Sequence, residues 1–211
     1  NIPMNAGCLR PIRIIVPEGS MLSPRYPAAV VAGNVEVSQA VTNCLFGALG
    51  AMAGAQGTMN NLTFGNTKYQ YYETICSGSP AGPTWHGTPG VHTHMTNSRL
   101  TDPEILELRF PVVLEDFHIR RGSGGKGKFR GGDGTHRQIR FLEEMDCALL
   151  SGHRRVAPFG LAGGENGQVG RNEVRRLGGV IETLKGCDQT VLKPGEAIVI
   201  VTPTPGGYGR A

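Results

Sequence analysis

Residues 34–52, NVEVSQAVTNCLFGALGAM, form the clearest periodic segment of the chain. Apolar residues recur here at i, i+3, i+4, i+7 and i+8, the spacing that places them along one face of an α-helix. They are Val37, Ala40, Val41, Cys44, Leu45, Ala48, Leu49 and Met52. The pattern predicts a long core helix over about 35–54, with Asn34 as its N-cap and Gly54 or Gly57 at its end.

Glycine is abundant both in this helix and around it. The chain of 211 residues contains 32 Gly and 14 Pro, with 39% hydrophobic and 18% charged residues. This composition excludes an all-helical bundle and a solvated disordered chain, and it fits one large domain or two small ones. Because Gly47, Gly50 and Gly54 lower helix propensity, we expect them where the backbone closely approaches a neighbouring sheet or helix.

Strand patterns dominate the rest of the chain. The segments with apolar or alternating character are 11–16, 58–64, 68–76, 112–120, 136–142, 147–154 and 196–201. A second, shorter helix is predicted over 101–110, because Thr101 and Glu104 have capping-box spacing and Pro103 suits a first turn. We therefore predict an α+β fold, with one long early helix packed on mixed or antiparallel sheets and a β-rich C-terminal half. An α+β portion over 1–110 and a β-rich portion over 111–211 would form two parts or one continuous domain.

Charge, cysteine content and hydropathy favour a cytoplasmic protein. The 21 basic and 17 acidic residues give a net charge of +4, too mild to call for nucleic acid. Five widely spaced cysteines, an odd number, indicate a reduced compartment with buried thiols. The absence of a long apolar run or signal-like start argues against a membrane protein or a secreted precursor. The first residues, NIPMNAGCLR over 1–10, read like the inside of a chain, so we expect a piece of a longer protein.

The sharpest local feature is His92-Thr93-His94. On an extended backbone residues i and i+2 face the same way, so both imidazoles could meet one metal ion or one anionic substrate. A third metal ligand would come from Glu73, His86, Asp102 or Glu104. In the alternative interpretation, the two histidines only form hydrogen bonds that hold a loop.

Polar residues on either side extend this candidate site. Thr96, Asn97, Ser98 and Arg99 follow at once, next to a predicted helix N-terminus that would favour a carboxylate or phosphate. The preceding segment 77–90, SGSPAGPTWHGTPG, is too rich in Gly and Pro for regular structure and carries Trp85 and His86. We expect residues 85–99 to converge on a small, negatively polarised guest, although the same groups could serve only to cap the loop and helix.

A glycine-rich basic segment, RGSGGKGKFRGGDG, spans residues 121–134. It lacks Walker spacing, so a nucleotide phosphate loop is not indicated, although a backbone nest for an anion remains open. The single RGG favours RNA binding only slightly, and a turn between two strands is the favoured interpretation. No GxSxG motif supports a serine hydrolase.

Taken together, these motifs resemble the C-terminal part of the hydantoinase B / 5-oxoprolinase family, which includes N-methylhydantoinase and acetone carboxylase relatives. The resemblance covers nearly the whole chain. The blocks that carry it are GTMNNLTFGN (57–66), YYET (71–74), GVHTHMTNSR (90–99), LTDPEILE (100–107) and RRGSGGKGKFRGGDG (120–134).

The resemblance implies an ATP-dependent enzyme that opens a cyclic amide, either 5-oxoproline to glutamate in glutathione metabolism or a hydantoin. Phosphorylation of the amide oxygen would create a good leaving group before water attacks the carbon. Complete family members pair a hydantoinase A part with a B part and are expected to be oligomers. ATP would be bound mainly by the A part, and a divalent metal ion, Mg or Mn, would lie outside this chain.

Site roles follow from the matched motifs. The candidate catalytic residues, which would orient or polarise the substrate, are His92, His94, Asn97 and Arg99. The candidate substrate-binding residues are Trp85, His86, Thr96 and Asp102, and His92 and His94 are also metal candidates. We expect the isolated chain to be inactive. Two alternatives stay open: a non-catalytic docking module for the A component, and an RNA-binding protein that uses residues 120–137, whose affinity would fall steeply with salt.

Overall fold

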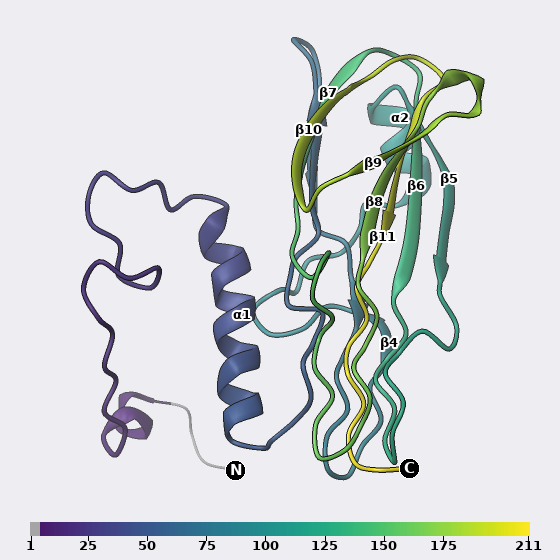
Figure 1. Ribbon diagram of the computed structural model, residues 1–211. Helices are drawn as coiled ribbons and strands as arrows, with labels where there is room; N and C mark the ends of the chain where they lie inside the picture. The colour runs from purple at the N-terminus through teal and green to yellow at the C-terminus, as the bar shows by residue number, and fades with distance from the viewer. Residues whose placement is uncertain (1–4) are drawn as a thin grey trace.

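Two antiparallel sheets form the body of the computed structural model, which describes residues 5–211 (Figure 1). Residues 1–4, the start of segment 1–10, lie outside the described residues. The larger sheet has the order β5 (Val112–Ile119), β6 (Thr135–Phe141), β11 (Ala197–Val201), β8 (Arg171–Arg175) and β9 (Ile181–Leu184). The smaller has the order β10 (Cys187–Leu192), β7 (Met145–Leu150), β1 (Asn61–Gly65) and β2 (Gln70–Glu73). The short strands β3 (Ser77–Gly78) and β4 (Pro89–Val91) pair with each other.

One hydrophobic core joins the two sheets. Phe64 of β1 and Phe141 of β6 meet edge to face, with ring centroids 5.1 Å apart. The same cluster of buried residues includes Leu149 of β7 and Ile198 of β11. The α+β prediction is therefore confirmed, with antiparallel rather than mixed sheets in the part of the chain that is described. Since β1 and β2 pair through β7 with β10, the smaller sheet contains strands from both 1–110 and 111–211.

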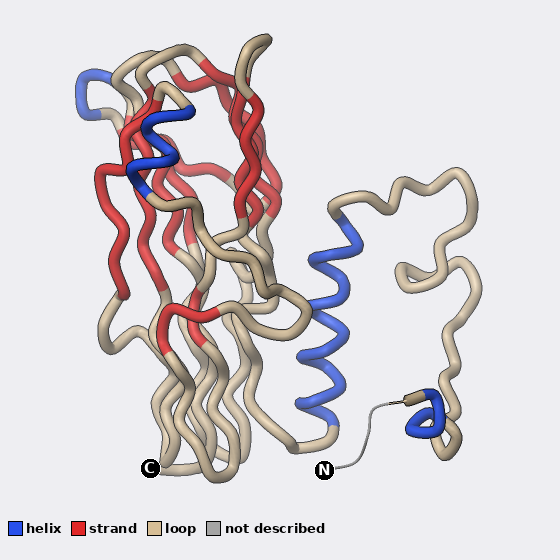
Figure 2. Tube along the Cα trace, turned by 180° about the vertical axis from the view of Figure 1, so that it is seen from behind, coloured by secondary structure: helices blue, strands red, loops and turns tan. Residues whose placement is uncertain are grey.

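The long helix α1 (Gly33–Ala48) stands beside the sheets (Figures 1 and 2) and ends earlier than predicted. Its N-cap position is Ala32, without a side-chain cap, so the assignment of Asn34 was wrong. The helix stops before residue 54 because Gly50 adopts φ = 66° and the Ala51 amide donates to the Phe46 carbonyl at 2.9 Å. A left-handed residue after the last turn is the usual way to satisfy free carbonyls.

The prediction of a core helix was also wrong. The side chains of α1 that are buried are the polar Gln39 and Asn43, whereas the predicted apolar stripe is largely exposed. Leu45 and Leu49 expose 60% and 78% of their surface. The helix thus attaches to the body through hydrogen bonds on its polar face and leaves its apolar face open.

Close packing explains two of the three helix-region glycines. A Cβ on Gly47 would lie 2.7 Å from the Phe159 ring, and one on Gly54 would lie 3.0 Å from the Phe159 amide nitrogen. The close approach is therefore to a loop, not to a sheet or helix. A Cβ on Gly50 would meet no atom within 4 Å, so the backbone conformation of this residue matters rather than its small size.

Glycine-rich loops run side by side at the end of the body that carries the C-terminus (Figure 2). They pack backbone against backbone, which a side chain would prevent: a Cβ on Gly167 would lie 1.8 Å from the Thr204 carbonyl oxygen. The segment 121–134 belongs here, and its amides are used internally. Gly125 donates to the Pro205 carbonyl and Gly131 donates to the Gly125 carbonyl, both at 2.9 Å.

Most predicted strands are present with shifted ends, but the one over 11–16 is wrong. Residues 11–16 are exposed and form no strand, and they follow the 3₁₀ helix η1 (Ala6–Leu9). The prediction missed β8, β9 and β10, which carry many polar residues, and the 3₁₀ helix η2 (Leu177–Gly179). Segment 77–90 is mostly irregular, as expected, but includes β3 and the start of β4.

The short helix α2 (Pro103–Arg109) confirms the second helix, with a different cap. The Asp102 side chain, not that of Thr101, accepts a hydrogen bond from the Glu104 amide at 3.1 Å. Of the cysteines, Cys76 and Cys147 are buried as predicted, whereas Cys8, Cys44 and Cys187 are exposed. Within residues 5–211 no helix has the length and apolar character needed to cross a membrane.

Candidate functional site

The buried polar face of α1 holds the loop of residues 91–99. The Gln39 amide nitrogen donates to the Thr96 hydroxyl at 2.7 Å and to the Thr93 carbonyl at 3.2 Å. One turn further on, His94 Nε2 lies 2.7 Å from Asn43 Oδ1. The His94 ring also stacks on Phe46 with centroids 6.0 Å apart. Each helical turn therefore fixes one polar residue of the loop.

His92 and His94 do not lie on an extended backbone. His94 has φ = 59°, so the argument that residues i and i+2 face the same way fails at this position. Burial lowers the pKa of both imidazoles below the ordinary value of 6.5, which keeps them neutral at pH 7. Both ring nitrogens of His92 are buried without a hydrogen-bond partner among the described residues. Because buried polar atoms are nearly always paired, this ring has unused binding capacity.

The other predicted site residues of this region lie in different environments. Asn97 and Arg99 are exposed, and Asp102 is occupied as the cap of α2. Thr96 is buried against Gln39. The convergence of these groups with the two histidines stays a prediction.

Trp85 and His86 make their contacts within the 77–90 loop and with the glycine-rich segment 121–134. The indole of Trp85, 45% exposed, covers Gly82, where a Cβ would lie 2.1 Å from the ring. His86 Nδ1 accepts a hydrogen bond from the Arg130 amide at 2.9 Å, and its ring meets Phe129 edge-on at 5.3 Å. The contacts of His86 thus lead to the glycine-rich segment 121–134, whereas those of His94 lead to α1.

A half-buried carboxylate, that of Glu36, fixes the first turn of α1. Glu36 Oε1 accepts hydrogen bonds from the Thr58 hydroxyl at 3.0 Å, the Met59 amide at 2.9 Å and the Asn61 side chain at 2.9 Å. Burial raises the pKa of Glu36 in spite of these bonds. Nearby, burial lowers the pKa of Arg154 to about 10, and its guanidinium donates to Asn60 Oδ1 at 2.9 Å. This polar network determines where the helix, and with it the 91–99 loop, sits on the body.

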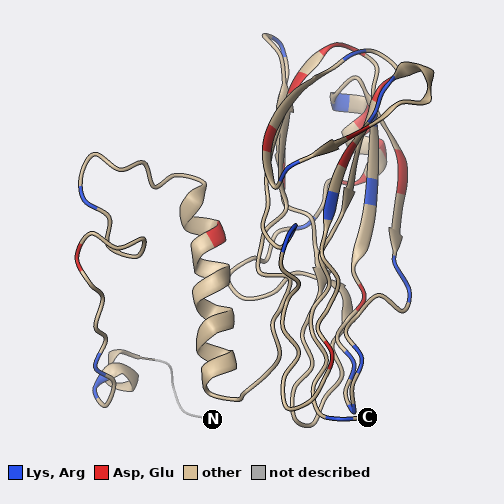
Figure 3. Cartoon of the chain, in the orientation of Figure 1, with Lys and Arg blue, Asp and Glu red and all other residues tan. Residues whose placement is uncertain are grey.

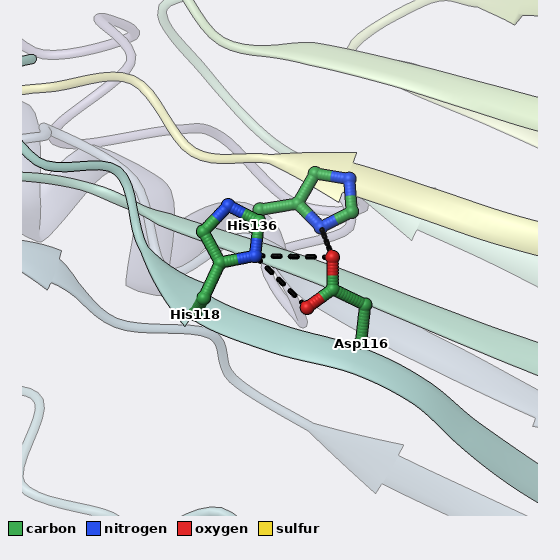
Figure 4. A group of neighbouring side chains, drawn as sticks. All are labelled: Asp116, His118 and His136. Carbon is green, nitrogen blue, oxygen red and sulfur yellow. Dashed lines mark hydrogen bonds and ion pairs between the residues drawn. The ribbon is translucent and has the colours of Figure 1, made fainter.

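A second group of candidate functional side chains, missed by the sequence analysis, lies on β5 and β6 (Figure 4). His118 Nδ1 lies 2.9 and 3.0 Å from the two carboxylate oxygens of Asp116, and His136 Nδ1 lies 3.2 Å from Asp116 Oδ2. The two rings stack, with centroids 4.9 Å apart and planes 17° apart. The available signal was Asp116-x-His118 within the predicted strand 112–120, where alternate residues share a face. The cross-strand partner His136 could not be found without the register.

Fold and site together define a β-rich α+β domain in which a polar helix face positions a histidine-bearing loop. The family described as hydantoinase B/oxoprolinase matches residues 1–211. The chain belongs to this family, which confirms the resemblance seen in its motifs.

Individual relatives agree with that assignment. The chain is 47% identical over 209 residues to a 5-oxoprolinase of Dictyostelium discoideum and 49% identical over 214 residues to 5-oxoprolinase 1 of Arabidopsis thaliana. Each alignment covers 99% of this chain and 16% of the relative. The chain therefore spans about a sixth of the length of these curated relatives.

A solved structure has the same fold. The ATP-dependent caprolactamase of Pseudomonas jessenii superimposes with a TM-score of 0.62 and 24% identity, over 76% of this chain and 30% of that one. At this identity the likeness shows the fold alone.

Proposed function

We propose that the chain is the C-terminal portion of the B component of an ATP-dependent cyclic-amide hydrolase, which opens 5-oxoproline to glutamate or opens a hydantoin. The observation that carries this proposal is the family match over residues 1–211, joined by relatives named 5-oxoprolinase at 47% and 49% identity.

In this proposal the 91–99 loop faces the substrate. Asn43 fixes the His94 ring and burial lowers the pKa of His94, so a neutral imidazole is positioned to orient or polarise an amide carbonyl. His92 has both ring nitrogens unused, and the exposed Arg99 guanidinium offers a bidentate partner for a substrate carboxylate. Asn97 would assist them, and Trp85, His86, Thr96 and Asp102 would bind the substrate at its edge.

The chain provides only part of the reaction. A cyclic amide is a poor electrophile, so ATP would activate its oxygen, and we place ATP mainly on a hydantoinase A-type subunit or domain. A divalent Mg or Mn ion would lie in another part of the B component. The complete enzyme would be a cytoplasmic oligomer, with the isolated chain inactive.

The test is substrate turnover by the complete B component together with its A partner. We expect release of glutamate from 5-oxoproline, or ring opening of a hydantoin, in the presence of ATP and none when ATP is omitted. Turnover of a hydantoin but not of 5-oxoproline would identify the hydantoin as the substrate and would still support ATP-dependent ring opening. Failure to open either ring with ATP present would overturn the proposal.

One observation favours a second candidate, a docking module for the A component. The open apolar face of α1, with Met21 and Leu22, lines a cavity of about 710 Å³. An exposed apolar surface of this kind commonly marks an interaction site. We expect Leu45→Ser with Leu49→Ser to weaken binding of the A component, measured by sedimentation velocity of mixed samples. Unchanged binding would exclude this face as the docking surface.

A further inference from the structure

Asp116, His118 and His136 direct one oxygen pair and two nitrogens at a common point (Figure 4). Their ligand atoms all lie within 4.8 Å of one another. Imidazole nitrogen and carboxylate oxygen are the donors with which proteins bind zinc and other borderline divalent cations. These residues belong to β5 and β6 and not to the 91–99 loop, so this group is separate from the proposed substrate contacts.

The hydrogen bonds within the group leave one potential metal-ligand atom without a partner, Nδ1 of His136. His136 Nδ1 is buried and lies 3.2 Å from Asp116 Oδ2, yet it makes no hydrogen bond with acceptable geometry. In the tautomer that carries its proton on Nε2, this nitrogen offers its lone pair to a ligand beside the carboxylate.

The stacking of the His118 and His136 rings also supports a shared binding site. His118 and His136 are directly opposite each other in the β5–β6 register, and their rings are nearly parallel. The register therefore places both imidazoles beside the Asp116 carboxylate, with Nδ1 of His118 at 2.9 Å and Nδ1 of His136 at 3.2 Å from its oxygens.

The sheet holds the three residues in place before any ion arrives. β6 lies inside the larger sheet, between β5 and β11. In β5 the register shifts between Leu114 and Asp116, directly before the site. Bulges of this kind often orient functional side chains. Ligands on a rigid element are pre-organised, which reduces the entropy lost on binding.

The geometry points to a binding site for one Zn²⁺-like divalent cation on Asp116, His118 and His136. Three protein ligands leave a fourth position for water or a small anion. The partial exposure of Asp116 and His118, 42% and 52% of the side chain, keeps this position open to solvent. His118 also lines a hollow of about 370 Å³ together with Arg120 and Arg121, whose positive charge suits an anionic fourth ligand.

Equilibrium dialysis of the metal-stripped chain against Zn²⁺, with metal quantified by mass spectrometry, tests the site. We expect one equivalent to bind, and Co²⁺ in its place to give the visible absorption of a low-coordinate centre. His118→Ala and Asp116→Asn should weaken Zn²⁺ by more than about 100-fold, since loss of outer-shell partners alone costs about 10–100-fold. His153→Ala, which removes an imidazole outside this group that bonds the Val156 carbonyl, is the matched control.

Circular dichroism establishes that each variant is folded. The Zn²⁺ titration of the wild-type chain tests the site even if a variant fails to fold. Less than one equivalent of Zn²⁺ on the wild-type chain, or no Co²⁺ absorption, would overturn the inference. Binding that survives both triad variants but is lost in His92→Ala would move the metal to the 91–99 loop and equally refute the assignment.

Discussion

Glu73 and Arg137 form a buried ion pair that links β2 of the smaller sheet to β6 of the larger. Arg137 donates from Nε to Glu73 Oε1 at 2.7 Å and from Nη2 to Oε2 at 2.9 Å, and the Arg137 and Glu73 side chains are 1% and 3% exposed. The Tyr71 hydroxyl donates a further bond to this carboxylate at 2.9 Å. A charge buried this deeply depends on its partner, so the pair fixes how the sheets meet.

Removal of one partner should be costly. We expect Glu73→Gln to lower the free energy of unfolding by about 3–5 kcal/mol, because the Arg137 charge would remain buried without compensation. Urea unfolding followed by circular dichroism measures the change. Glu115→Gln is the control, since Glu115 pairs with Arg140 at 30% and 36% exposure and such pairs contribute about 0–1 kcal/mol. Equal losses in the two variants would contradict this account of the ion pair.

Buried histidines should make stability depend on pH. Burial lowers the pKa of His92, His94 and His153 below 6.5, so between 6.5 and the folded values the unfolded chain binds more protons. Their contribution is complete above pH 6.5 and is lost as the pH falls through the folded pKa values. We expect a lower urea midpoint at about pH 5.5 than at about pH 7.5.

A variant separates this effect from other titrations. Glu36 has the opposite effect on the pH dependence of stability. Its pKa is raised, so its contribution is lost as the pH rises from 4.5 through the folded value. His92→Leu should reduce the fall in the urea midpoint between about pH 7.5 and about pH 5.5, because it removes one of these imidazoles. A pH dependence identical in His92→Leu and wild type would show that this imidazole is not kept neutral by the fold.

At the scale of elements, Gly50 determines where α1 ends. Its φ of 66° is costly for a residue with a Cβ, by about 1–2 kcal/mol, so we expect Gly50→Ala to destabilise the chain by that amount. Gly33→Ala, at the first residue of α1 with no atom near the added carbon, should instead stabilise it by about 0.5–1 kcal/mol. Thermal unfolding of both variants measures the two changes, and a shift of the same sign in both would refute this interpretation of the helix end.

The same helix shows what periodicity can and cannot predict. Its existence follows from the i, i+3, i+4 spacing, but its buried face does not, because Gln39 and Asn43 bury themselves by hydrogen bonding to residues 55, 93, 94 and 96 far along the chain. Strands such as β11, with five consecutive buried residues, are evident from sequence. β8 is not, since its sequence RNEVR places a single apolar residue, Val174, in the core.

The candidate site divides in a similar way. The two histidines and the polar residues after them marked the 91–99 loop, which the family resemblance also includes, and the structure shows how α1 holds it. The partner residues Gln39 and Asn43, and the cross-strand pair His118 and His136, depend on register and helix docking, which local spacing does not encode.

At the scale of the whole molecule, two halves with different packing meet. The upper part buries apolar side chains between two sheets, and the other end packs glycine-rich backbone segments against each other (Figure 1). Lys and Arg residues lie in both parts, and so do Asp and Glu residues (Figure 3). This distribution gives the RNA-binding alternative no particular support, and its test remains the salt dependence of binding.

The most direct test of the proposed role of the 91–99 loop is the kcat/KM for ATP-dependent ring opening by the complete enzyme. His94→Ala and Arg99→Ala should each lower kcat/KM by about 100-fold or more, the scale of a lost acid–base or orienting group. Arg109→Ala, which removes another exposed guanidinium on α2, should leave it unchanged. Wild-type kcat/KM in both His94→Ala and Arg99→Ala would contradict the account.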